Sequence, residues 1–160
     1  MGGLATVENA TVLLIAATVA NGVATGATFD QVVKQLPARR RIGAGAYTAY
    51  LRAADLRNGL VWYPILVVST AVTTVAAVVT GLLHEPTSRE MAALIIMAAG
   101  VTAHVVATAP TALLMLTLRH GTRAVSETLD RYAGIVATHA AALATTLTAT
   151  VCALSFAINL

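Results

Sequence analysis

The residue with the clearest chemical potential in this sequence is His104, which stands near the middle of a long apolar segment. That segment, residues 91–118, runs for about 28 residues without a charged side chain. About 20 helical residues cross a hydrocarbon core of roughly 30 Å, so we expect it to be a membrane span. An ionisable ring at that depth is costly and normally has a partner in the protein interior. His104 is therefore the first candidate for a functional residue, although a neutral core histidine bonded to a threonine fits the same pattern.

Two more polar residues, His139 and Asn21, lie inside predicted spans. At about 1.5 Å per residue, both lie about 10 Å from the cytoplasmic edge and His104 lies about 20 Å from it, so the three could line one cavity that opens to the cytoplasm. Asn21 could equally join two helices. Such a cavity suits a flat, apolar small molecule whose acidic group could pair with Arg52 or Arg57. The predicted substrate-binding residues are Asn21, Tyr47, Arg52, Asp55, Asn58, Trp62, Tyr63 and Thr108.

Two histidines on different helices also raise the question of a metal centre. Each could give one ring nitrogen to Cu or Fe, but a catalytic metal site usually has at least three protein ligands. No carboxylate lies within the predicted spans, so Glu8, Asp55 or Asp130 would have to reach in from an edge. A Cu or Fe site at His104 and His139 stays open at this stage.

The composition places these residues in an integral membrane protein. Of 160 residues, 58% are hydrophobic and only 11% are charged, whereas about a quarter of an average soluble domain is charged. We predict an all-α, single-domain, four-helix transmembrane bundle with spans at about 10–29, 61–83, 91–118 and 132–160. The expected surroundings are a lipid bilayer, and the expected location is the bacterial inner (plasma) membrane.

The basic residues are concentrated in the connections between the spans. Of ten Lys and Arg residues, six lie in residues 30–60, three in the third connection and one in the second, with none in either tail. By the positive-inside rule, the first and third connections are cytoplasmic and both termini lie outside. The net charge of +3 therefore indicates orientation and no nucleic-acid partner. Within residues 30–60 we expect Pro37 to break the chain and a helix to follow from Ala38.

Small residues predict close helix packing. Gly22 and Gly26 form a G-x-x-x-G motif, which lets another helix approach closely. Because four thin, Ala-rich helices enclose little space, we also expect a homo-oligomer. A non-catalytic scaffold or accessory subunit needs the same small-residue faces, with the histidines as core residues. A small multidrug-type transporter is disfavoured, because it usually needs an intramembrane carboxylate to couple protons, and the spans hold none.

Several features together resemble the anthrone-oxygenase-like family of small membrane proteins. They are four spans, the long basic connection with LPARRR and a Tyr-rich stretch, Pro110 late in the third span and His139 early in the fourth. The resemblance covers about residues 21–141. Family members associated with polyketide pathways are linked to the oxidation of anthrones to anthraquinones by molecular oxygen. The resemblance implies a role for His139, a kink at Pro110 and a contribution from residues 22–29.

The leading hypothesis is therefore a membrane-embedded oxygenase or oxidase that uses O2 as co-substrate on a small apolar, aromatic or polyketide-like substrate. A phenolic substrate would be deprotonated to an electron-rich anion that reacts with O2 directly, so the protein supplies a base, an apolar pocket and a polar stabiliser. We predict His139 or His104 as the base and Asn21 and Tyr63 as hydrogen-bonding groups that orient the substrate. Oxidation at nitrogen and a metal-dependent variant are equally compatible with these residues.

Overall fold

The chain folds into long helices in the computed structural model, which describes residues 2–54, 59–120 and 125–158. Four of its helices are long and apolar enough to cross a membrane, and the described ranges contain no strand. The predicted all-α four-helix transmembrane bundle is therefore confirmed. The elements are α1 (Gly2–Asp30), the π-helical turn η1 (Gln31–Gln35), α2 (Leu36–Ala54), α3 (Leu60–Leu82), α4 (Ser88–His120) and α5 (Val125–Ile158).

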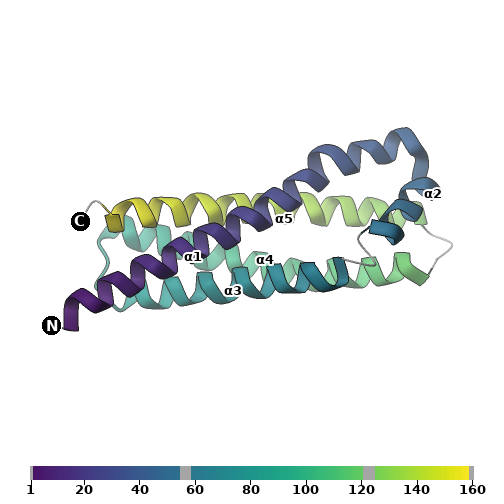
Figure 1. Ribbon diagram of the computed structural model, residues 1–160. Coiled ribbons are helices and arrows are strands. Elements are labelled where there is room, and N and C mark those ends of the chain that lie inside the picture. Colours follow the sequence, from purple (N-terminus) through teal and green to yellow (C-terminus); the bar gives the residue numbers. More distant parts are fainter. Residues whose placement is uncertain (1, 55–58, 121–124, 159–160) are drawn as a thin grey trace.

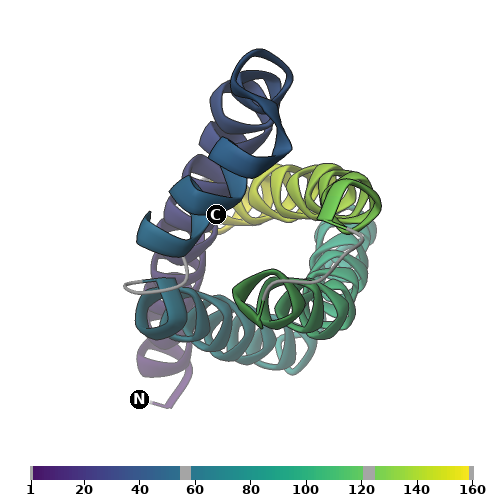
Figure 2. The same cartoon turned by 90° about the vertical axis from the view of Figure 1, so that its right-hand side faces the viewer.

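The four long helices surround a common axis. Helix α1 packs against α3 and α5, and α4 packs against the same two helices, while the backbones of the diagonal pairs, α1 with α4 and α3 with α5, do not come close in the described ranges. Both termini lie at one end of the bundle and α2 folds back at the other end (Figure 1). Figure 2 shows the bundle from the end that carries α2. Of the four neighbouring pairs, α4 and α5 make the most extensive contact, and α3 and α4 the least.

The first connection contains more helix than the sequence predicts. The helix does not stop at Pro37, so the prediction of a break there is wrong. Just before Pro37 the chain makes the π-helical turn, in which the Leu36 N–H donates to the Gln31 carbonyl five residues back. A proline has no N–H and crowds the carbonyl four residues back, and a wider turn beside it accommodates the ring. The chain reverses instead at Gly43, at φ 81° and ψ 161°, a conformation that glycine adopts far more readily than other residues.

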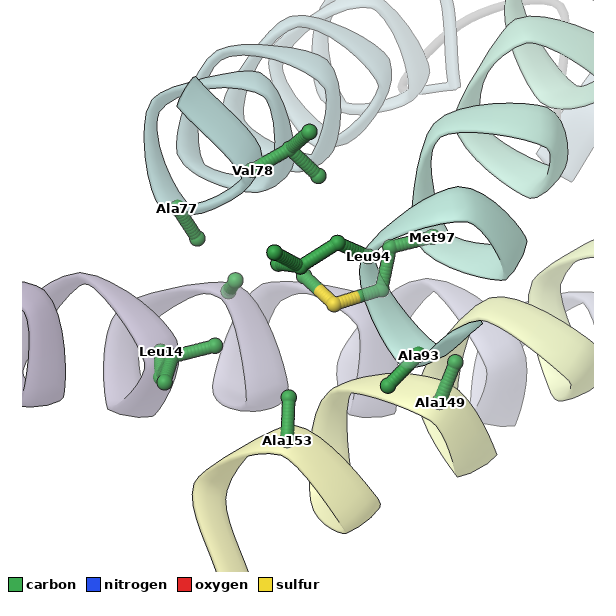
Figure 3. Close-up of a cluster of buried hydrophobic side chains, with 9 residues drawn as sticks. Leu14, Ala77, Val78, Ala93, Leu94, Met97, Ala149 and Ala153 are labelled. Atoms are coloured by element: carbon green, nitrogen blue, oxygen red, sulfur yellow. The ribbon is translucent and has the colours of Figure 1, made fainter. Parts of the chain in front are cut away.

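Two apolar clusters fill the bundle, one toward each end. Lipid chains are as apolar as the side chains themselves, so these clusters stabilise the fold through close packing. The terminal cluster, shown in Figure 3, joins all four long helices through Leu14, Ala17, Ala77, Val78, Ala93, Leu94, Met97, Ala149 and Ala153. The α2 cluster joins α2 to α4 and α5 through Tyr47, Leu51, Met115, Leu118, Leu129, Tyr132 and Val136.

The closest glycine contacts lie outside the G-x-x-x-G motif. A Cβ at Gly22 would lie 4.0 Å from Leu147 Cδ1, and a Cβ at Gly26 would meet nothing within 4 Å. A Cβ at Gly100 of α4 would instead overlap Thr146 Oγ1 of α5 and lie 3.1 Å from Thr146 Cβ. Gly100 therefore permits the tight α4–α5 contact. The homo-oligomer stays a prediction, for which the open face at Gly26 leaves room.

Gly100→Ala is expected to lower the free energy of unfolding by about 1–3 kcal/mol, the usual cost of overfilling a packed site. Thr146 can avoid the new methyl group only by giving up its hydrogen bond to the Ala142 carbonyl, at 2.8 Å. Thermal unfolding in one detergent measures the effect. Gly26→Ala is the matched control, and it should be neutral or stabilise the helix slightly. Equal stability of the two variants would show that Gly100 is not a packing requirement.

Candidate functional site: a cavity with a buried histidine pair

The structure joins the two candidate catalytic residues directly. His104 from α4 and His139 from α5 share a hydrogen bond between His104 Nδ1 and His139 Nε2. Their ring centroids lie 4.4 Å apart with an interplanar angle of 40°. His104 is 2% exposed and His139 is 9% exposed. Two ionisable rings therefore satisfy each other in the interior of the bundle, where an isolated polar group would be costly.

The pair leaves one fully buried ring nitrogen without a partner among the described residues. His104 Nε2 is buried and has no hydrogen bond to any described residue. A neutral imidazole has one N–H and one acceptor nitrogen, so one ring donates within the pair and the other accepts. Which ring donates decides whether the outer nitrogen of His139 is a donor or a base.

Both histidines line a cavity of about 440 Å³, a size typical of small-molecule sites. Helical periodicity explains the lining, because residues spaced by three and four share one helix face. Thus α4 contributes His104 and Thr108, and α5 contributes Tyr132, Val136 and His139. The remaining lining residues are Ala24, Ala27, Thr28 and Gln31 of the first helix and its π turn, Gly59, Tyr63, Pro64, Leu66, Val67 and Val68 at α3, Thr111, Ala112, Met115 and Leu116 of α4, and Leu143 of α5.

A second polar pair lies toward the α2 end of the cavity. The Gln31 side-chain amide donates to the Tyr63 hydroxyl oxygen at 2.6 Å. Along α5, seven residues or about 10 Å separate Tyr132, at this end of the cavity, from His139. The cavity thus has apolar walls with hydrogen-bonding groups at two levels, which is the usual arrangement in sites that orient an apolar ligand.

Two of the predicted substrate-binding residues line this cavity. They are Tyr63 and Thr108, whose hydroxyl donates to the His104 carbonyl at 2.9 Å. Asn21 is fully buried but is not among the lining residues. Its amide donates to Thr74 Oγ1 and to the Ala17 carbonyl, both at 2.8 Å. Asn21 therefore joins α1 to α3, which is the alternative role that its sequence position allowed.

Three more of the predicted residues, Tyr47, Trp62 and Arg52, are not among the lining residues of the cavity. Tyr47 is buried in the α2 cluster, and Trp62 is exposed near the start of α3, where an interfacial aromatic side chain is expected. Arg52 donates through Nε and Nη2 to the Leu118 carbonyl, at 3.1 and 3.0 Å. It therefore satisfies a carbonyl near the C-terminal end of α4. Asp55 and Asn58 lie outside the described residues.

Sequence reasoning missed Gln31 and Tyr132. The first predicted span ended at residue 29, so Gln31 was placed in a polar connection. The polar residues of this region nevertheless follow helical spacing, at Asn21, Thr28 and Gln31. Continuing this pattern past the apolar segment places Gln31 on the inner face of the bundle. Tyr132 opens the predicted fourth span, and it shares a helix face with His139 because seven residues make about two turns.

The donor atoms fit a metal centre poorly. Nowhere in the described ranges do three or more His, Cys, Asp or Glu side chains come together to hold a metal ion. Within the pair, one nitrogen of each ring is already bonded to the other ring. Since stable catalytic sites usually have at least three protein ligands, we assign no step to Cu or Fe.

Comparison with protein-family models, with curated proteins and with solved structures finds no match for this chain. The resemblance to the anthrone-oxygenase-like family therefore stays a prediction. The function of this chain is therefore inferred from the lining of the cavity and from its histidine pair.

Proposed function

We propose that this chain is a membrane-embedded oxygenase that oxidises a small, apolar aromatic substrate of the anthrone type with O2. The observation that carries the proposal is the histidine pair in the wall of a cavity large enough for such a molecule. Apolar walls hold a polycyclic ring system, and a buried base can act on it without competition from water. A bilayer location also suits the chemistry, because O2 and the substrate both partition into apolar media. We place the protein in the bacterial inner membrane, where it would serve a biosynthetic oxidation.

The overall reaction balances without a further reactant. Loss of a proton from the CH2 group of an anthrone gives an electron-rich anion that adds O2 and, with a proton, forms a hydroperoxide at that carbon. Removal of the remaining C–H proton then forms the carbonyl, as the O–O bond breaks and the leaving oxygen departs as water. Anthrone plus O2 gives anthraquinone plus water. The carbon loses four electrons and O2 accepts them.

His139 is the proposed base, because it is the more exposed ring of the pair. In the tautomer that serves this chemistry, His139 Nε2–H donates to His104 Nδ1, and the lone pair of His139 Nδ1 accepts the substrate proton. His104 then stabilises the imidazolium through the hydrogen bond that the pair already has. Tyr63 and Gln31 orient a carbonyl or phenol oxygen at the other level of the cavity.

The test is O2 consumption by protein in nanodiscs supplied with 1,8-dihydroxyanthrone, together with the absorbance of the quinone product. We expect one O2 per anthrone and a rate well above that of empty nanodiscs, which measure spontaneous oxidation. A rate equal to that of empty nanodiscs would overturn the oxygenase and favour the non-catalytic scaffold. Metal analysis of the same preparation tests the metal-dependent variant. Stoichiometric Cu or Fe that disappears in the His104→Ala/His139→Ala variant would make the pair a ligand set in place of a base.

A further inference from the structure

Apolar clusters lie beyond the cavity toward both ends of the bundle. Toward the termini, the terminal cluster brings side chains of all four long helices together (Figure 3). Toward the other end, Tyr47 and Leu51 of α2, both almost fully buried, pack in one cluster with Met115 and Tyr132 of the cavity wall. A ligand that entered along the bundle axis would therefore meet packed apolar side chains toward either end.

The exposed lining residues all belong to two neighbouring helices. They are Pro64 and Val68 of α3 and Ala112 and Leu116 of α4, spaced one turn apart on each helix. Val68 is 60% exposed and Leu116 is 41% exposed. In contrast, every lining residue of α1, η1 and α5 is buried or half-buried. The cavity thus reaches the outer surface of the bundle between α3 and α4, the neighbouring pair with the least extensive contact.

This opening faces lipid. Val68 lies seven residues after Val61, where the candidate span Val61–Leu82 begins, which is about 10 Å along the helix. A hydrocarbon core is roughly 30 Å thick, so this depth is level with the acyl chains of one leaflet. No Asp, Glu, Lys or Arg is among the lining residues. Arg52, which was expected to pair with an acidic ligand, donates instead to the Leu118 carbonyl.

We propose that a neutral, membrane-dissolved polycyclic phenol or quinone enters this cavity sideways from the bilayer, between α3 and α4. The ligand class rests on the proposed function, whereas the route rests on the positions of the exposed lining residues. The flat ring system lies between the apolar walls, and its oxygen atoms reach the two polar levels at the histidine pair and at Tyr63. A charged ligand is disfavoured, because the cavity offers it no counter-charge and it would have to cross hydrocarbon.

Val68→Trp narrows the opening with a large side chain. The probe is 1,8-dihydroxyanthraquinone, which the proposed reaction does not consume, and its association rate is measured by stopped-flow fluorescence in nanodiscs. We expect Val68→Trp to lower that rate by about tenfold or more. Val72→Trp is the matched control, because Val72 is 61% exposed on the same helix one turn away and does not line the cavity. It should associate at the wild-type rate.

A second variant and its control test the same route if Val68→Trp does not fold. Leu116→Trp narrows the α4 side of the opening, and Leu113→Trp is its control, because Leu113 is exposed and does not line the cavity. Equal association rates in the opening variants, their controls and wild type would overturn the lateral route.

The route and the oxygenase can fail separately. Quinone binding that Val68→Trp slows, in a protein that does not oxidise anthrone, would leave the lateral route standing and remove the oxygenase. Anthrone oxidation that proceeds at equal rates in Val68→Trp and Val72→Trp would leave the oxygenase standing and remove the lateral route. Failure of the quinone to bind wild type would overturn the ligand class.

Discussion

His139→Ala is expected to lower the rate of O2-dependent anthrone oxidation by about 10²–10⁴-fold, the usual contribution of a positioned general base. The physical reason is that the variant removes the ring that takes the substrate proton, while the apolar walls of the cavity remain. Quinone binding should therefore change much less than turnover. The measurement is the initial rate of O2 consumption in nanodiscs, with quinone association measured on the same preparation.

Controls separate this loss from a folding defect. His139→Gln keeps most of the side-chain volume and a hydrogen-bonding group beside His104, so it should fold when the alanine variant does not, yet it too should lack the base. His84→Ala changes a histidine that is exposed at the end of α3, with its Nδ1 on the Thr80 carbonyl at 2.6 Å. It should keep wild-type turnover. Normal turnover in folded His139→Gln would show that the pair is a packing element.

His104 should act through His139. His104→Ala removes the group that holds the ring of His139 and stabilises its charged form, so kcat should fall while KM changes little. Because the two rings work as one unit, the double variant should be no slower than His139→Ala alone. If the rate losses of His104→Ala and His139→Ala instead multiply in the double variant, the two histidines act on separate steps.

The positions of the helices could be predicted from the sequence, and so could the need of His104 for a partner. Both depend only on the length and composition of one apolar segment. Long apolar segments must form helices in a bilayer, where each backbone polar group needs a partner within the segment. An ionisable ring inside such a segment needs a partner as well. The identity of that partner could not be predicted, because His104 and His139 lie 35 residues apart and meet only through the register between α4 and α5. A single sequence contains no direct measure of that register.

Several side chains that looked available for a ligand have partners elsewhere in the fold. Asn21 and Arg52 were both plausible ligand-binding groups by residue type and depth. In the structure the amide of Asn21 joins two helices and the guanidinium of Arg52 satisfies a helix end. Residue type shows what a side chain can bond to, but tertiary neighbours decide what it does bond to. The first helix also continues past residue 30, where Lys34 pairs with Asp30 and Arg39 pairs with Asp130 of α5, contacts of which the second depends on the tertiary fold.

The reversal at Gly43 is the feature that lets α2 fold back and pack against α4 and α5 at one end of the bundle. Residues 44–54 turn back from it and place Tyr47 and Leu51 in the α2 cluster. The backbone at Gly43, with φ 81° and ψ 161°, lies in a region that residues with a Cβ avoid. The docking of α2 therefore depends on the backbone conformation of this glycine and not on a lack of space, since an added Cβ there would meet no atom within 4 Å.

Gly43→Ala is accordingly expected to destabilise the docked α2 by about 1–3 kcal/mol, although the new methyl group has free space. Gly45→Ala, two residues away, is expected to stabilise α2 instead. Gly45 is helical and exposed, and at such a position alanine is favoured over glycine by about 1 kcal/mol. Hydrogen exchange of residues 44–54 should become faster in the first variant and slower in the second. If hydrogen exchange of residues 44–54 changes in the same direction in both variants, helix propensity and not the reversal at Gly43 determines the stability of α2. A faster quinone association in Gly43→Ala would, in addition, show that undocking α2 opens a second path to the cavity from the aqueous end.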